Sequence, residues 1–210
     1  MNSLPKVYEE LRDRVRIHIK QIRKSQKKHP EYAVALLISV ASEALSTLRG
    51  QAPYTVFAKE LLPQTVSEEV GRSLFEAVRH GLAHRYDTAL IAAGKRDVVV
   101  VVTWKKPQLH LRVLVKDWLG DGVRRPGVYL DTETMWRALD VAFRRMTRQL
   151  HNEKKLARIV IRNGRRLDQK YTVRPAREEA SRWREGWAAF LGGGGSRGGA
   201  LSKGRADITC

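Results

Sequence analysis

The stretch Ser67–Tyr86, SEEVGRSLFEAVRHGLAHRY, decides how the rest of the chain is interpreted. Ser67 suits the N-cap of a helix, and two glutamates follow it in the first turn, where the helix dipole favours negative charge. Apolar residues then recur at the spacing of one helical face, at Val70, Leu74, Ala77 and Val78. This pattern predicts an amphipathic helix that begins after Ser67.

The second half of this stretch, residues 79–86, is dense in groups that carry protons or bind phosphate. Arg79, His80 and His84 fall within six residues. A histidine near its ordinary pKa can transfer protons at neutral pH, and an arginine fork matches phosphoryl oxygens. Gly81 weakens the helix at this point. The alternative that these histidines are only solvated or satisfied side chains stays open.

Arg79, four intervening residues, His84 and then Tyr86 resemble the Arg-x4-His motif of HEPN domains. The segment VRHGLAHRY is similar to the RNGLAH type of segment in that superfamily, with His80 where a polar residue, often Asn, is usual. The resemblance implies a helical domain that dimerises around the motif. It also implies a metal-independent endoribonuclease that acts as a toxin or as an antiviral (abortive infection) effector.

Cleavage of RNA requires that the 2′-hydroxyl lose a proton, that the 5′-oxygen gain one, and that phosphoryl charge be neutralised. The hypothesis assigns acid and base catalysis to His84 and charge stabilisation to Arg79, with His80 and Tyr86 supporting the phosphate or base. One chain offers one motif histidine, so a homodimer would complete the pair. The alternative is a non-catalytic RNA-binding or scaffolding module, and an antitoxin or regulatory protein is a further candidate partner.

The composition limits the kinds of partner and the cellular location that we expect for this protein. The 210 residues carry a formal net charge of +18, which favours nucleic acid first and an anionic membrane surface second. The one cysteine, Cys210, excludes an internal disulfide. Residues 1–28 lack the apolar core of about 7 to 15 residues that a signal peptide needs. No run approaches the roughly 18 apolar residues of a membrane span. We therefore expect a soluble, cytoplasmic protein without a membrane partner.

Two long helices are predicted before the motif, and the connector over residues 51–64 is predicted to contain a short helix at 56–62. Residues 4–28 have one apolar stripe and many basic residues, of which Arg16, Lys20 and Arg23, together with Arg85, are the candidate RNA contacts. A merely solvated basic face is the alternative. Residues 31–48 are apolar nearly all round and predict a buried core helix that ends before Gly50. Its one internal acid, Glu43, is predicted to pair with an arginine, for which Arg79 is the candidate, rather than to act in catalysis.

After the motif, residues 87–94 are expected to be a loop, or a short helical continuation through residues 89–91. The β-branched run 97–103 and the alternating run 109–115 predict a β-hairpin. Glycines and a proline in 120–127 indicate a loop. Asp131 or Thr132 can then cap a core helix whose apolar stripe comprises Met135, Leu139, Ala142, Phe143, Met146 and Leu150.

The predicted fold is therefore mainly α: a HEPN-like helical bundle over residues 1–150 with an inserted β-hairpin at about 97–116, or α+β by strict count. Residues 151–191 are expected to form a basic extension, with a second hairpin around Asn163-Gly164 and a helix over 175–191. The tryptophans of that helix could stack on bases or form an interface seam. Residues 192–210 are a flexible glycine-rich tail or an expression scar.

Metal and cofactor chemistry is not predicted. Glu76, His80 and His84 share one helical stripe, but it would span about 12 Å, which is too long for one ion with bonds near 2 Å. No glycine-rich phosphate loop lies between a strand and a helix.

Overall fold

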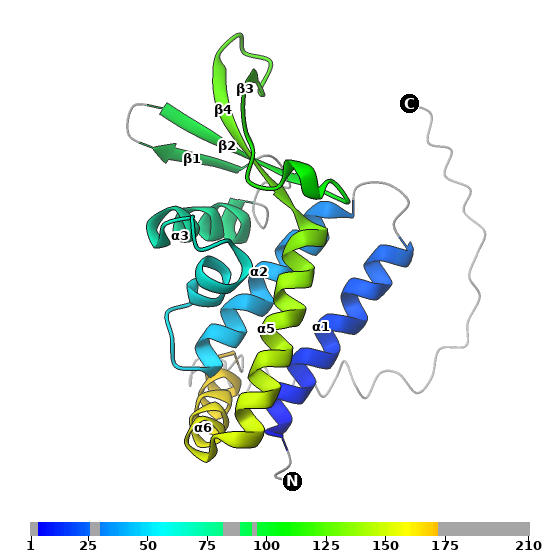
Figure 1. Cartoon of the computed structure of the whole chain (residues 1–210), viewed down its shortest axis with the longest axis vertical. Coiled ribbons are helices and arrows are strands. Elements are labelled where there is room, and N and C mark those ends of the chain that lie inside the picture. The colour runs from blue at the N-terminus through cyan, green and yellow to red at the C-terminus, as the bar shows by residue number, and fades with distance from the viewer. Residues whose placement is uncertain (1–3, 26–29, 82–88, 94–95, 172–210) are drawn as a thin grey trace, which may run out of the picture. The chain divides into compact units, whose positions relative to one another are not determined.

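The computed structural model describes residues 4–25, 30–81, 89–93 and 96–171. They form a mainly helical unit with a small sheet at one end (Figure 1). This confirms the coarse prediction of a mainly α or α+β fold. The compact unit runs from Met1 to Leu167. It therefore includes residues 151–167, the first part of the extension that we expected to lie outside the domain.

Helix α2 (Glu31–Leu48) is the centre of this unit, as predicted. It contacts α1 (Lys6–Ser25) and α5 (Thr132–Asn152). Three serines buried in α2 donate their hydroxyl protons to backbone carbonyls three or four residues earlier, so they cost little inside the core. The helix ends before Gly50, whose φ of +73° confirms the left-handed position expected there.

By length and composition, α2 is the one described helix that could cross a membrane, which departs from the expectation that no segment would qualify. Half of the residues in this window are buried inside the unit. The core helix of a soluble protein satisfies the same criterion, so this finding alone does not indicate a membrane span.

Helix α5 matches its prediction closely. Asp131 is the N-cap and accepts from the backbone N–H of Thr134 at 2.9 Å. The whole predicted stripe of this helix is buried. The core that it joins also includes Tyr8, Phe57, Phe75 and Val160.

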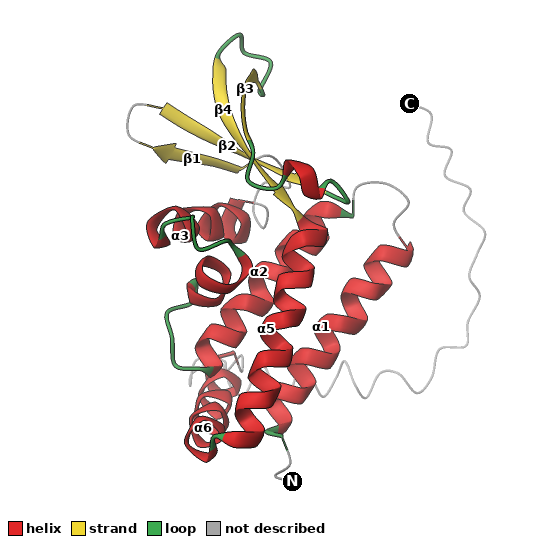
Figure 2. Cartoon of the chain, in the orientation of Figure 1, coloured by secondary structure: helices red, strands yellow, loops and turns green. Residues whose placement is uncertain are grey.

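The sheet corrects the predicted hairpin (Figure 2). The first predicted run forms strand β2 (Arg96–Thr103), but only the end of the second run, from Val113, lies in strand β3 (Val113–Asp117). The two strands do not pair with each other. Strand β4 (Arg124–Asp131) lies between them, parallel to β2 and antiparallel to β3. Strand β1 (Ala89–Ala93) pairs antiparallel with the other edge of β2, where we had expected a loop or helix.

Gly127 explains why β4 was mistaken for a loop. A Cβ at this position would lie 2.5 Å from the indole of Trp118, so only glycine lets that ring pack on the strand. Pro126 lies opposite Val115 of β3, one residue before the pairing of β4 with β2 begins at Gly127, so its missing backbone donor interrupts no pair with β2. Both residues, which indicated a turn, serve close packing within a strand.

The second predicted hairpin is also wrong, because residues 154–171 form helix α6 (Lys154–Tyr171). The Asn163 side chain is buried and donates to the carbonyls of Thr47 and Leu48, both at 3.2 Å, so it satisfies the C-terminal end of α2. Gly164 allows close contact between α6 and α1, since a Cβ there would lie 2.7 Å from Val7. The predicted helix over 175–191 and the tail over 192–210 lie outside the described residues.

Candidate active site around Arg79

Helix α3 (Glu68–Glu76) carries the motif arginine toward the core. Its N-cap is confirmed, because the Ser67 hydroxyl accepts from the N–H of Val70 at 3.4 Å. Leu74 and Phe75 are buried, whereas Val70, predicted on the same apolar face, has a relative exposure of 51%. The buried face of α3 therefore contains Leu74 and Phe75 and does not include Val70.

The helix widens into a π-helical turn, η2 (Ala77–Gly81), before the described segment ends. Sequence analysis expected Gly81 to weaken the helix, and the change in hydrogen-bond pattern already begins at Ala77. Single π-helical turns inside helices are frequent at functional sites, because the looser turn redirects the side chains on it. Here the redirected residues are Arg79 and His80.

Arg79 is paired with Glu43, as predicted. Its Nε donates to Oε2 of Glu43 at 2.8 Å. Both side chains are partly buried, with relative exposures of 29% and 25%. Because Glu43 belongs to the central helix α2, this contact fixes the guanidinium to the core helix of the unit. Arginine has five N–H donors, so one hydrogen bond to a carboxylate leaves the fork able to bind a second anion.

His80 has a different environment. Its Nε2 lies 3.0 Å from Oε2 of Glu76, one helical turn earlier, and both side chains are largely exposed. Such a surface pair contributes little to stability and holds the imidazole on the outer side of the helix. The arrangement keeps His80 accessible to a ligand and does not bring it to Glu43.

Three motif residues, His84, Arg85 and Tyr86, lie outside the described residues. The structure therefore locates two of the five motif residues, Arg79 and His80, which precede the other three in the chain. Among the described residues, no group of three His, Cys, Asp or Glu side chains is arranged to hold a metal ion.

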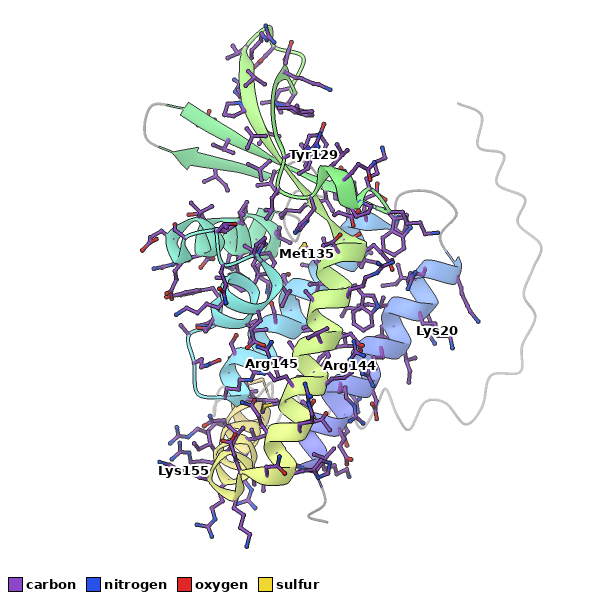
Figure 3. The ribbon with its side chains drawn as sticks, in the orientation of Figure 1. Lys20, Tyr129, Met135, Arg144, Arg145 and Lys155 are labelled. Atoms are coloured by element: carbon purple, nitrogen blue, oxygen red, sulfur yellow. The ribbon has the colours of Figure 1, made fainter. Side chains whose placement is uncertain are left out.

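The RNA contacts predicted on α1 lie on a different surface. Arg16 pairs with Asp140 of α5 at 2.7 Å, and Arg23 pairs with Glu133 of α5 at 3.1 Å. The Arg23 guanidinium also lies over the ring of Trp104, 5.2 Å from its centroid. Lys20 is exposed on α1 (Figure 3). The structure brings two of these residues to α5 and not to Arg79.

Sequence analysis missed the basic residues of α5 that face α1. A groove of about 780 Å³ is lined by Arg12, Arg16, Val141, Arg144, Thr147 and Arg148. The signal was present as i, i+4 arginine pairs on each helix, but the α5 segment was analysed only for its apolar stripe. Figure 3 shows Arg144 on the side of α5 that faces α1, and Arg145 on the other side.

Comparison with known proteins leaves the class of protein as a prediction. No protein-family model matches the chain. No curated protein matches it. No solved structure matches it either.

Proposed function

We propose that this chain is a metal-independent endoribonuclease of the HEPN type. In this proposal it acts in the cytoplasm as a toxin or antiviral (abortive infection) effector, with a composite active site at a homodimer interface. The observation that carries the proposal is the Arg79–Glu43 contact. It anchors a phosphate-binding guanidinium to a buried helix, five residues before His84 in the chain.

The proposed reaction needs two proton transfers and one charge stabiliser. His84 removes the proton from the 2′-hydroxyl as that oxygen bonds to the adjacent phosphorus. The bond from phosphorus to the 5′-oxygen breaks, and the leaving oxygen takes a proton from the His84 of the second copy. The Arg79 guanidiniums neutralise charge that develops on the phosphoryl oxygens. His80 and Tyr86 orient the phosphate or the base, and Arg85 binds the strand nearby.

The contact of Arg79 with Glu43 matters because stabilisation of the transition state depends on hydrogen-bond donors that are already in place. A flexible arginine would have to lose side-chain entropy as it engages the transition state, whereas Glu43 has already restricted Arg79. The carboxylate occupies Nε, and the terminal amino groups of the guanidinium are the pair that matches a phosphoryl group.

The experiment is cleavage of labelled single-stranded RNA by the purified full chain in EDTA. Wild-type protein should cleave, and His84→Ala should reduce the rate by about 10²- to 10⁴-fold, the usual contribution of general acid-base catalysis. Sedimentation should give a dimer for both proteins. Equal cleavage by wild type and variant, or a monomer with full activity, refutes the composite site.

A second function is favoured by the same contact. An arginine paired with a partly buried carboxylate can be purely structural, in which case the motif only builds the dimer and the chain is a non-catalytic RNA-binding or scaffolding module. That function predicts salt-sensitive RNA binding without cleavage, unchanged by His84→Ala.

A further inference from the structure

Helices α1 and α5 lie side by side and antiparallel, which sets the register of the groove between them. The Tyr8 hydroxyl donates to the Phe143 carbonyl at 2.5 Å, and Arg16 meets Asp140 further along. Arg23 then reaches Glu133. The residue numbers rise along α1 while those of their partners fall along α5. Basic residues at equivalent heights therefore face one another across the groove.

The groove contains more positive than negative charge. Its lining includes four arginines, Arg12, Arg16, Arg144 and Arg148. Asp140 accepts from Arg16 through Oδ1 and lies 3.2 Å from Arg144 through Oδ2, so one carboxylate serves two guanidiniums.

The remaining two arginines of the lining differ in their partners. Asp13 pairs with Arg12. Arg148 makes no ion pair with any residue that the structure describes. Since arginine stays protonated at all physiological pH values, this excess is permanent and favours an anion from solution.

The spacing of the arginines suits a repeating anion. Arg12 and Arg16 on α1, and Arg144 and Arg148 on α5, are each four residues apart, which is about 6 Å along a helix. Successive phosphates of an extended nucleic-acid strand repeat on a similar length scale. Arg144 has a relative exposure of 62% and Arg16 of 38%, so both guanidiniums are accessible from solution.

The basic surface continues beyond the groove in the direction of the α1 C-terminus. Lys20 follows Arg16 by one turn and is exposed. Arg23 beyond it is paired with Glu133 and lies over the ring of Trp104. The basic surface therefore extends one turn past Arg16, to Lys20, as expected for a polymer rather than for a single small anion. A membrane surface fits less well, because the groove is concave and Val141 is the one apolar side chain in its lining.

We propose that the α1–α5 groove binds the phosphodiester backbone of a single strand of RNA, with Arg12, Arg16, Arg144 and Arg148 as the phosphate contacts. The proposal rests on the proposed function only in naming RNA as the polymer. It adds a binding surface distinct from the Arg79 motif, so that one surface supplies affinity and the other supplies chemistry.

The test measures affinity by fluorescence anisotropy of a 2′-O-methyl oligoribonucleotide, which has no 2′-hydroxyl to attack and cannot be cleaved. In the full chain, Arg144→Ala/Arg148→Ala should weaken binding about 25-fold at 0.1 M salt, since each single-strand phosphate contact contributes about fivefold there. The slope of log K against log salt should become less steep by about 1.4.

The matched control is Arg145→Ala/Lys59→Ala, which removes the same charge from side chains that pair with Glu60 and Glu68 away from the groove. It should change affinity less than threefold. Asp140→Asn, which frees two guanidiniums, should tighten binding several-fold. Thermal unfolding of each variant confirms that the fold is kept.

Equal weakening by the two double variants overturns the proposal, because it would show only an effect of net charge. Displacement of the oligonucleotide by tripolyphosphate at the same phosphate concentration also overturns it, in favour of a small-anion site. So does a groove variant that loses binding to phosphatidylserine vesicles while its affinity for the oligonucleotide is unchanged. Because the probe is inert to cleavage, an inactive enzyme does not affect these outcomes, and loss of groove binding does not test His84.

Discussion

Two arginine sites of this protein differ in how their charge is compensated. Arg79 has a carboxylate from the central helix at 2.8 Å and is largely shielded from solvent. The arginines between α1 and α5 outnumber the carboxylates beside them, and Arg144 is mostly exposed. A compensated, fixed arginine is suited to one position in a reaction, whereas accessible arginines that exceed their carboxylates in number are suited to holding a polyanion. In our two proposals the same residue type therefore has different tasks according to its neighbours.

The largest effect expected from this comparison is on chemistry. Arg79→Lys keeps the charge but loses the fork, and we expect the single-turnover rate of RNA cleavage to fall about 100-fold, as when one transition-state donor is removed. The affinity for the non-cleavable oligonucleotide should stay within about threefold. The groove variant Arg144→Ala should weaken binding of the oligonucleotide and leave the single-turnover rate of cleavage nearly unchanged. If Arg79→Lys weakens binding and leaves the rate per bound strand intact, the division of tasks is wrong.

The next largest effect is expected on stability, through the packing of helix α3, which precedes Arg79. Gly71 of α3 packs against Ala58, and a Cβ at Gly71 would lie 2.7 Å from the Ala58 Cβ and 3.0 Å from its Cα. Gly71→Val should therefore destabilise the fold by about 1–3 kcal/mol through overpacking. For a chain of this size the thermal midpoint should fall by roughly 2–4 °C per kcal/mol.

The neighbouring variant Val70→Ala is the control, because Val70 is half exposed. It should change stability by less than about 0.5 kcal/mol. A Gly71→Val protein as stable as wild type would mean that α3 can move away from Ala58 without cost. In that case its contact does not position Arg79.

A smaller effect is expected on the wall of the groove. The Tyr8 hydroxyl donates to Phe143 O and lies 2.8 Å from the Thr147 hydroxyl, so it joins α1 to α5. Tyr8→Phe should cost about 1 kcal/mol in urea unfolding, the net value of one such hydrogen bond. The affinity for the oligonucleotide should hardly change, because Arg16 and Arg144 keep their positions. A tenfold loss of affinity would show that this tyrosine, rather than the arginines, organises the groove.

The smallest expected effect is a pH dependence of stability that involves His110 and neither of the two arginine sites. Burial lowers the pKa of His110 below its ordinary value, although the charge of Asp131 opposes the shift. His110 Nδ1 accepts from the Asp131 N–H at 3.1 Å, and its Nε2 is buried without a hydrogen-bond partner among the described residues. The neutral ring is therefore the form that the fold accommodates.

The unfolded chain therefore binds a proton at His110 more readily than the folded chain does. The stabilising contribution of His110 is complete above a pH of about 6.5 and is lost as the pH falls through the lowered folded pKa. Wild type should lose more unfolding free energy between pH 7.5 and pH 5 than His110→Gln does. Oligonucleotide affinity should not follow this change, since guanidiniums do not titrate there. Identical pH profiles for wild type and His110→Gln would refute the assignment.

The helical half of the fold could be predicted because its signals are local. The Ser67 and Asp131 caps, the buried stripe of α5 and the apolar α2 all lie within single segments. The Glu43–Arg79 pair, although 36 residues apart, was predictable because a lone acid in an apolar helix needs a cation.

The sheet could not be predicted in the same way. Whether β4 lies between β2 and β3 depends on contacts between segments, and Pro126 and Gly127 indicate a turn when considered alone. The pair Asn163-Gly164 was wrongly interpreted as a turn for a similar reason, because both residues are poor helix formers. They are accepted in α6 because Asn163 donates a hydrogen bond to the Thr47 carbonyl and Gly164 allows close contact with Val7 of α1. The arginine groove was missed because neither helix contains it alone.

Asn163 also determines where the chain can be shortened. A fragment that stopped at residue 150, the domain end suggested by the sequence, would remove the Asn163 amide that donates to the Leu48 carbonyl, while the Thr47 carbonyl would keep the Gly50 N–H. It would also remove Val160, which is fully buried, and expose the part of the core that this residue covers. Expression of an isolated domain therefore has to retain α6 at least through Leu167. Internal cuts that separate α6 from α2 should yield insoluble pieces rather than an independently folded domain.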